Sequence, residues 1–242
     1  MVRTDQRQNS PDDGQKRAFV KEMFTAIAPR YDLLNHVLSL NIDKGWRRRT
    51  VSKLDWESNP EGAFLDVCSG TMDLAHELAG RDAFRGKVVG ADFVVPMLKL
   101  GLTKYPSLTA VGADALSLPF PDASFDGCTV GFGVRNLTDI GAGIREMGRV
   151  LKPGATLAVL EFSTPKWPGI KTLYLWYFRH VLPWIGRVVS KHTTAYRYLP
   201  DSVMDFPDPE TFSEGIRAAG FDDVKHQSLT FGIATIHWGV RK

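Results

Sequence analysis

The stretch that decides the fold is FLDVCSGTMDLAHELAG, residues 64–80. Its first four residues are apolar enough for a buried strand, and the part after Ser69 and Gly70 has the apolar spacing of a helix. A strand, a tight turn and a helix N-terminus in succession are typical of sites for nucleotide-like ligands, because backbone N–H groups there face the ligand. Such turns normally contain several glycines. Here Met72 stands where a second glycine is expected.

Strands and helices alternate on both sides of this stretch. Residues 15–28 have the spacing of an amphipathic helix, and Asp43 is expected to cap a second helix that runs through Trp46 and Val51. Apolar segments typical of strands lie at residues 63–67, 87–93, 108–114, 125–134, 155–163, 221–229 and 232–241. The last two are joined by a short turn, so they should be antiparallel. This pattern predicts an α/β fold with a mostly parallel sheet covered by helices on both faces.

Residues 164–200 interrupt this alternation and are expected to form a helical insertion before the last helix, at residues 209–219. The insertion is rich in aromatic and basic residues: Trp167, Tyr174, Trp176, Tyr177, Phe178, Trp184, Lys171, Arg179, Arg187 and Lys191. This composition suits an apolar substrate tail or the membrane–water interface. A dimer face or an ordinary helical cap fits it nearly as well. We expect residues 1–15 to be a flexible tail and residues 16–242 to be one domain, with residues 16–55 as a helical cap.

Length and composition exclude several classes of protein. A chain of 242 residues that is 43% hydrophobic fits one globular domain, and a net charge of +3 is too small to indicate nucleic-acid binding. The two cysteines, Cys68 and Cys128, lack metal-site spacing, so we expect free thiols in a reducing compartment. The N-terminus has no signal-peptide pattern, and no apolar run is long enough to span a bilayer. These features predict a cytoplasmic protein with no metal site.

Polar residues end three successive strands of the predicted sheet. They are the turn Ser69-Gly70-Thr71, Asp92 after the second strand, and Asp114-Ala115 after the third. A carboxylate after the second strand can accept hydrogen bonds from both hydroxyls of a ribose, and one after the third can meet an adenine amine. Each residue alone could equally be a helix cap or a turn residue. Their occurrence at three strand ends favours an adenosine-containing ligand.

The ligand is predicted to be S-adenosylmethionine rather than NAD. Only Gly70 is present in the window 69–74, so the glycine pattern of dinucleotide-binding turns is missing. S-adenosylmethionine has no pyrophosphate that the turn must hold, so a turn with one glycine suffices more easily to bind it. Its sulfonium cation also suits a site with carboxylates such as Asp66, Asp73 and Asp92.

Longer motifs closely resemble the demethylmenaquinone/ubiquinone C-methyltransferase family. They are LPFPDASFDGCTVGFGVRNLTD, REMGRVLKPGATLAVLEFSTP, YRYLPDSVMDFP, MFTAIAPRYDLLNHVLSL and the closing LTFGIATIHWG. The resemblance covers residues 20–242 and implies a seven-stranded, Rossmann-like class I methyltransferase fold with an antiparallel last strand. It also implies methylation, by S-adenosylmethionine, of a ring carbon of a polyprenyl naphthoquinol or benzoquinol. On the family pattern, cofactor contacts fall at Thr71, Asp92, Asp114, Ala115 and Gly131, which offers only its backbone.

Met72 departs from the family's Gly-Thr-Gly-Asp pattern. If residue 72 has helical backbone angles, methionine is simply the better helix former. If the position requires a positive φ, a Cβ atom costs about 1–2 kcal/mol. Because the surrounding motifs are intact, we favour a tolerated, flexible methionine beside the cofactor. The alternative is a blocked pocket and a non-catalytic binding protein.

The implied reaction needs help in ionising a phenol, whose pKa is near 10. Arg135 and Asn136, just after the fourth strand, are candidates to stabilise the phenolate or to orient a water molecule. The rival interpretation is a structural arginine paired with Asp139, four residues later.

Two further residues are catalytic candidates. Tyr31 lies in a segment, with Asp32 and Asn35, that would cover the cofactor, and His237 in the last strand has a side chain that can titrate near neutral pH. A core tyrosine and a structural histidine are the rival interpretations. His36 and His192 are weaker candidates, and the sequence does not name the general base.

Three questions stay open at this level. The substrate is expected to be a lipid quinol, but another small aromatic molecule is the alternative. Peripheral contact with the inner membrane surface and homo-oligomerisation are both compatible with the aromatic insertion.

Overall fold

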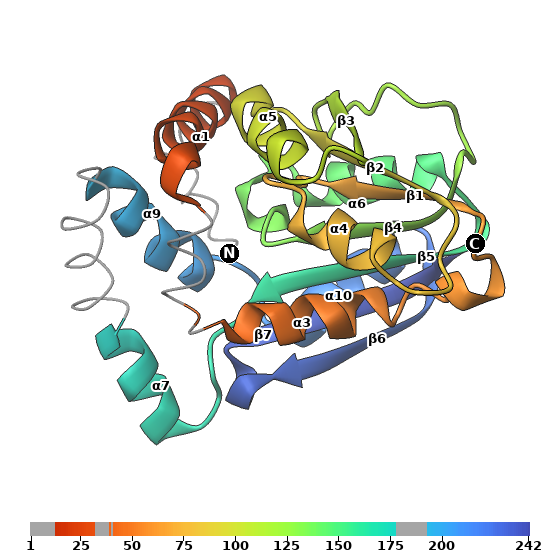
Figure 1. The fold of residues 1–242 in the computed structure, drawn as a ribbon. Coiled ribbons are helices and arrows are strands. Elements are labelled where there is room, and N and C mark those ends of the chain that lie inside the picture. The colour runs from red at the N-terminus through yellow and green to blue at the C-terminus, as the bar shows by residue number, and fades with distance from the viewer. Residues whose placement is uncertain (1–12, 32–38, 40, 178–192) are drawn as a thin grey trace.

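The computed structural model describes residues 13–31, 39, 41–177 and 193–242, and its centre is a seven-stranded sheet (Figure 1). The strands are β1 (Ala63–Val67), β2 (Lys87–Asp92), β3 (Thr109–Gly112), β4 (Phe125–Gly131), β5 (Leu151–Phe162), β6 (Phe221–Leu229) and β7 (Ala234–Arg241). Their order across the sheet is β3-β2-β1-β4-β5-β7-β6. Strand β7 is antiparallel to both of its neighbours, and the remaining pairs are parallel. The predicted fold class is therefore confirmed.

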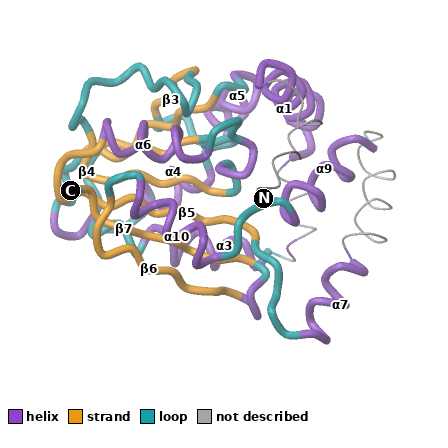
Figure 2. Tube along the Cα trace, turned by 180° about the vertical axis from the view of Figure 1, so that it is seen from behind, coloured by secondary structure: helices purple, strands orange, loops and turns teal. Residues whose placement is uncertain are grey.

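Helices cover both faces of this sheet (Figures 1 and 2). One face carries α3 (Ile42–Val51), α4 (Asp73–Ala79) and α5 (Val95–Lys104), and the other carries α6 (Ile140–Val150) and α10 (Pro209–Ala218). Each face has its own core of buried apolar side chains. Val51, Leu74 and Leu98 belong to the first core, and Met147 and Ile216 belong to the second.

Two of these helices begin where the sequence provides an N-cap. Asp139 accepts a hydrogen bond from the backbone N–H of Ala142 at 2.8 Å and so starts α6. Asp208 does the same for α10, where it accepts from the N–H of Glu210 at 3.1 Å. The prediction that Asp43 caps α3 is wrong. The helix begins at Ile42, so Asp43 lies inside it. The Asp43 carboxylate accepts a hydrogen bond from Ser39 Oγ at 2.6 Å.

A third group of helices lies beyond the carboxyl ends of the parallel strands (Figure 1). It contains α1 (Asp13–Ile27), α7 (Pro168–Trp176) and α9 (Thr193–Met204), and α1 packs against both α9 and α5. Short 3-10 turns complete the chain: η1 (Ala28–Arg30), η2 (Trp56–Ser58), η3 (Val134–Asn136) and η5 (Thr230–Gly232). None of the described helices is long and apolar enough to cross a bilayer.

The boundaries of the predicted segments stay predictions, with two structural remarks. Helix α1 starts at Asp13, inside the segment expected to be a tail, and residues 1–12 lie outside the described residues. The predicted insertion contains α7 and most of α9, and residues 178–192 between them also lie outside the described residues.

Candidate active site

The turn after β1 is closed by backbone hydrogen bonds. The N–H of Ser69 donates to the carbonyl of Ala91 on β2 at 3.1 Å, and the N–H of Met72 donates to the carbonyl of Ser69 at 2.7 Å. Gly70 has a φ of +53°, in the left-handed region where glycine is favoured. The turn therefore needs Gly70 for its shape, as the sequence predicts.

Met72 also has a left-handed backbone, with a φ of +66°, at the N-cap of α4. Its side chain is 0% exposed and points into the core formed by α4, α5 and the sheet, where it lines neither of the cavities described below. A Cβ atom on Gly90 or on Gly101 would come within 2.8 Å of Met72 side-chain carbons, so these two glycines make room for it. The helical interpretation is wrong, and the methionine side chain, predicted to lie beside the cofactor, lies outside both cavities. Burial of the thioether offsets the backbone cost of about 1–2 kcal/mol.

Asp92 is a preorganised acceptor at the end of β2. Its side chain accepts hydrogen bonds from the N–H of Gly70 at 2.9 Å and from the N–H of Val94 at 2.8 Å, one on each oxygen. Each oxygen keeps capacity for a further hydrogen bond, which is what two ribose hydroxyls need. The residue is 7% exposed, and this burial raises the pKa of its carboxyl group to about 6.

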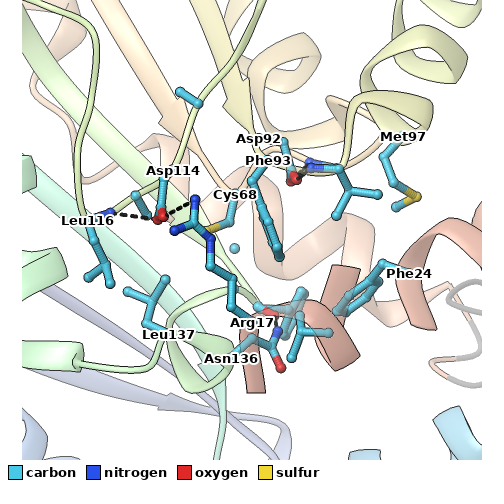
Figure 3. A pocket seen from close by; sticks show the side chains of 18 of the residues that line it. Arg17, Phe24, Cys68, Asp92, Phe93, Met97, Asp114, Leu116, Asn136 and Leu137 are labelled. Carbon is cyan, nitrogen blue, oxygen red and sulfur yellow. Dashed lines mark hydrogen bonds and ion pairs between the residues drawn. The ribbon is translucent and has the colours of Figure 1, made fainter. Parts of the chain in front are cut away.

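Asp114 lies across the same cavity from Asp92 and contacts helix α1 (Figure 3). Arg17 of α1 forms an ion pair with its carboxylate at 2.7 Å, and the N–H of Leu116 donates to its other oxygen at 3.0 Å. Lys16, the preceding residue, donates to the carbonyl of Leu137 at 2.7 Å. Helix α1 is thus held over the cavity at two points.

Two adjoining cavities collect the predicted cofactor residues. The first is lined by Tyr31, Gly70, Asp92, Asp114, Ala115, Gly131 and Asn136, together with Arg17, Val20 and Phe24 of α1. The second is lined by Arg47, Asp66, Ser69, Thr71 and Asp73, and it shares Tyr31, Gly70 and Gly131 with the first. Apart from the Met72 side chain, the residues predicted to bind the cofactor line these two cavities.

Charged groups dominate the second cavity. Asp66 is fully buried, and burial raises its pKa to about 7 although Thr129 Oγ1 donates to it at 2.7 Å. Asp73 is different: burial favours its neutral form, but the charges of Arg47 and Lys104 outweigh this and lower its pKa. Arg47 lies 2.9 Å from Asp43 and 3.0 Å from Asp73. Ser69 Oγ is buried and has no hydrogen-bond partner among the described residues.

Arg135 forms a buried ion pair that the sequence analysis missed. Its Nη1 lies 2.6 Å from Glu161 Oε1, and its backbone N–H donates to Glu161 Oε2 at 3.3 Å. The two side chains are 7% and 1% exposed. The rival pairing of Arg135 with Asp139 is wrong, since Asp139 caps α6. A glutamate inside the apolar run LAVLEF was the available signal, because a buried acid needs a partner.

Asn136 and Tyr31 line the first cavity, whereas the neighbouring Arg135 lines neither cavity. Asn136 Nδ2 donates to the carbonyl of Phe132 at 3.4 Å, whereas its Oδ1 is buried with no partner among the described residues. The ring of Tyr31 lies edge-on to Phe24, with 6.0 Å between the ring centroids. Asp32, Asn35, His36 and His192 lie outside the described residues.

His237, a predicted catalytic candidate, lies away from this site. It lines neither cavity and lies under α10, where its Nδ1 is 3.1 Å from Ser213 Oγ and its ring packs edge-on against Phe212. The side chain is 1% exposed, and burial lowers its pKa to about 3. The imidazole is therefore neutral at physiological pH and structural.

The residues of the two cavities fit S-adenosylmethionine. Asp92 offers two acceptors for a ribose, Asp114 and Ala115 line the same cavity, and Ser69 and Thr71 line the adjoining one.

Comparisons with known proteins agree with this geometry. The chain is 45% identical over 231 residues to the ubiquinone/menaquinone biosynthesis C-methyltransferase UbiE of Geotalea daltonii, covering 93% of this chain and 97% of the relative. It is 47% identical over 223 residues to a demethylmenaquinone methyltransferase of Thermus thermophilus, covering 90% and 100% of the two chains. The family model described as "ubiE/COQ5 methyltransferase family" matches residues 12–241.

The chain belongs to the ubiE/COQ5 methyltransferase family. Solved structures agree on the fold of this family member. One is described as a SAM-dependent methyltransferase, possible histamine N-methyltransferase, from Thermotoga maritima. It matches with a TM-score of 0.65 and 18% identity, covering 91% of this chain and 99% of that one. At that identity the match shows the fold alone.

Proposed function

We propose that this chain methylates a ring carbon of a polyprenyl hydroquinone, demethylmenaquinol or its benzoquinol counterpart, with S-adenosylmethionine as the methyl donor. The observation that carries the proposal is the identity of 45% and 47%, over nearly the full length, to relatives named for this chemistry. The preformed adenosine-type acceptors at the ends of β2 and β3 support the cofactor independently.

The cofactor spans the two cavities in this proposal. Asp92 accepts hydrogen bonds from the ribose hydroxyls, and Asp114 with the backbone of Ala115 receives the adenine. The methionine end lies along the turn that contains Ser69 and Thr71, with further backbone contact at Gly70 and Gly131. Arg47, which lines the second cavity and is paired with Asp43 and Asp73, also receives the α-carboxylate in this proposal.

The reacting ring lies between the cofactor and the aromatic side chains of α1, α7 and α9. S-adenosylmethionine supplies an electrophilic methyl group on a sulfonium. Arg135 stabilises the phenolate that activates the ring carbon, and Asn136 Oδ1 orients the phenol or a water molecule that takes its proton. Tyr31, which lines both cavities, holds the ring against the methyl group and keeps bulk water out.

The polyprenyl tail leads toward the aromatic insertion, where we also propose contact with the membrane surface. Trp167, just before α7, is 73% exposed, and Trp176, the last residue of α7, is 54% exposed. Tryptophan is favoured at the membrane–water interface. A cytoplasmic protein that docks reversibly on the inner membrane surface fits this arrangement. Homo-oligomerisation through the same face is the rival proposal.

Two assays test the function. Deleting the gene should cause the demethylated quinone precursor to accumulate, and its ring type identifies naphthoquinol or benzoquinol. Purified protein should methylate that precursor, kept reduced, at least tenfold faster than simple soluble phenols. Equal rates on soluble phenols would instead support a methyltransferase for another small aromatic molecule. No binding of S-adenosylmethionine at millimolar concentration would support a non-catalytic protein.

A further inference from the structure

Three buried polar atoms near the proposed ring site have no hydrogen-bond partner among the described residues. They are Arg135 Nε, Asn136 Oδ1 and the hydroxyl oxygen of Tyr198. Burying such a group without a partner costs about 1–3 kcal/mol, so folded proteins rarely do it without a functional reason. Arg135 and Asn136 are already assigned to the reaction. Tyr198 is not.

Tyr198 lies on α9 at the aromatic side of the site. Helix α9 packs against α1 and against the η3 turn that contains Arg135 and Asn136. The ring of Tyr198 lies edge-on to Phe19 of α1, with 5.5 Å between the ring centroids. It belongs to an apolar cluster that also contains Phe24 and Tyr31, and both of these line the first cavity. The cluster therefore adjoins the place where the cofactor and the ring meet.

The Tyr198 hydroxyl is a permanent donor within the field of the buried ion pair. Burial raises its pKa, while the charge of Arg135 lowers it and the charge of Glu161 raises it. The phenol consequently stays protonated at neutral pH and can donate a hydrogen bond.

We propose that Tyr198 is a catalytic residue that donates a hydrogen bond to the substrate oxygen that becomes phenolate, beside the Nε–H of Arg135. Glu161 does not touch the ring, since its oxygens are engaged with Arg135 and with the N–H of Phe162 at 2.9 Å. It is a positioning residue that fixes the direction of the guanidinium. Together the two donors form an oxyanion site for an aromatic hydroxyl. This inference rests on the proposed quinol methylation.

In this step Tyr198 keeps its own proton. The ring O–H bond breaks and its proton leaves to water, so negative charge develops on the oxygen that faces Tyr198. Electrons from the ring then form the new C–CH3 bond, and the pair of the broken S–CH3 bond stays on sulfur. Loss of the proton from the methylated carbon and reprotonation of the oxygen restore the aromatic hydroquinone. A hydrogen bond to a charged oxygen is stronger than one to a neutral phenol, so the donor lowers the barrier.

Tyr198→Phe removes only the hydroxyl, and it should lower the rate of methylation without lowering the stability of the protein. Since the hydroxyl has no hydrogen-bond partner among the described residues, the melting temperature should stay unchanged or rise. The kcat for the demethylated quinol should fall roughly 10–100-fold, and S-adenosylmethionine affinity should stay within twofold. The rise of kcat with pH should also shift to higher pH by about one unit, because the bound phenol becomes harder to ionise.

Ser213→Ala is the control. The buried Ser213 hydroxyl donates to the carbonyl of Pro209 at 2.8 Å and lines neither cavity, so its removal should lower the melting temperature and leave kcat and its pH profile unchanged. If Tyr198→Phe behaves like this control, the hydroxyl is structural and the proposal is overturned. A kcat within twofold of wild type, with an unshifted pH profile, overturns it as well.

An ionisable naphthol tests the oxyanion site independently of quinol methylation. The absorbance of 4-nitro-1-naphthol reports its ionisation, and the wild-type protein with bound S-adenosylhomocysteine should lower the pKa of the bound naphthol. Tyr198→Phe should weaken that shift. If the wild type shows the shift but methylates no quinol, the oxyanion site stands and the quinol activity fails. If Tyr198→Phe shows the same shift as wild type, Tyr198 does not contact the aromatic oxygen.

Discussion

The cofactor edge of the sheet and the aromatic side beyond it are built in different ways. At the edge, Asp92 and Asp114 accept hydrogen bonds from backbone N–H groups two positions later along the chain. Asp92 also accepts one from the neighbouring turn, and Asp114 is paired with Arg17 of α1. On the aromatic side, Arg135 is held by Glu161, 26 residues away, and Tyr198 comes from a separate helix. Among the described residues, both regions keep buried polar atoms without a hydrogen-bond partner: Ser69 Oγ at the edge, and three atoms on the aromatic side that a substrate would satisfy. Local turns shape most of the cofactor edge, whereas activation of the ring depends on long-range pairing.

The largest effect expected from this contrast is on stability. Glu161→Ala leaves the Arg135 charge buried and uncompensated, so the free energy of unfolding should fall by about 3–5 kcal/mol. Denaturant unfolding measures this, and Lys152→Ala is the control. Lys152 forms an exposed ion pair with Asp126 at 2.7 Å and should contribute less than about 1 kcal/mol. Similar losses in both variants would show that the Arg135–Glu161 pair does not organise the aromatic side.

Arg135→Lys separates chemistry from cofactor binding. Lysine keeps the positive charge but lacks the planar guanidinium, which can donate hydrogen bonds to Glu161 and to the ring oxygen at the same time. We expect kcat to fall by roughly 100-fold and the dissociation constant of S-adenosylmethionine to change less than twofold. Steady-state kinetics and calorimetry measure the two quantities. A parallel loss of rate and affinity would mean that the two regions do not act separately.

Asp92→Ala should show the reverse pattern. Removal of a charged acceptor for the ribose should weaken S-adenosylmethionine binding by about 1–3 kcal/mol. With saturating cofactor, kcat should stay within a few-fold of wild type. Calorimetry provides the affinity, and an unchanged value would remove Asp92 from the site.

Acidification should weaken cofactor binding through the same residue. Burial raises the Asp92 pKa to about 6, and only the ionised carboxylate accepts hydrogen bonds on both oxygens. Affinity should therefore be highest above pH 6 and fall toward about tenfold per pH unit below it. The Asp92→Asn variant should lose this dependence, and any slope that it retains belongs to Asp66, whose pKa is raised to about 7. An identical slope in Asp92→Asn and wild type would contradict the assignment.

Met72→Gly should have the smallest effect on binding. Its side chain lines neither cavity, so S-adenosylmethionine affinity should change by less than about tenfold, or 1.4 kcal/mol. Stability should fall, because the lost core packing outweighs the relief of a left-handed backbone. If the wild type fails to bind the cofactor and Met72→Gly binds it, the methionine blocks the site after all.

The sequence predicts which residues line the cavities at the cofactor edge, because most of them lie within single strand–turn–helix units. Apolar periodicity predicts the strands, and the polar residue after each strand predicts the acceptors. The errors concern side-chain direction and partners from distant segments. Met72 points into the core because Gly90 and Gly101 leave space, and His237 is buried because α10 covers it. Neither fact is encoded near the residue itself, and the same holds for the pairing of Arg135 with Glu161.

Transfer of a labelled methyl group tests the central claim most directly. Purified protein is mixed with S-adenosylmethionine carrying a 13C methyl group and with demethylmenaquinol, or its benzoquinol counterpart, kept reduced without oxygen. The account predicts that one of these quinols gains a single labelled methyl, with the carbon shift of an aryl methyl in NMR and a strict requirement for protein. Absence of label from both quinols, or label with the carbon shift of a methoxy group on the ring oxygen, would contradict carbon methylation by this chain.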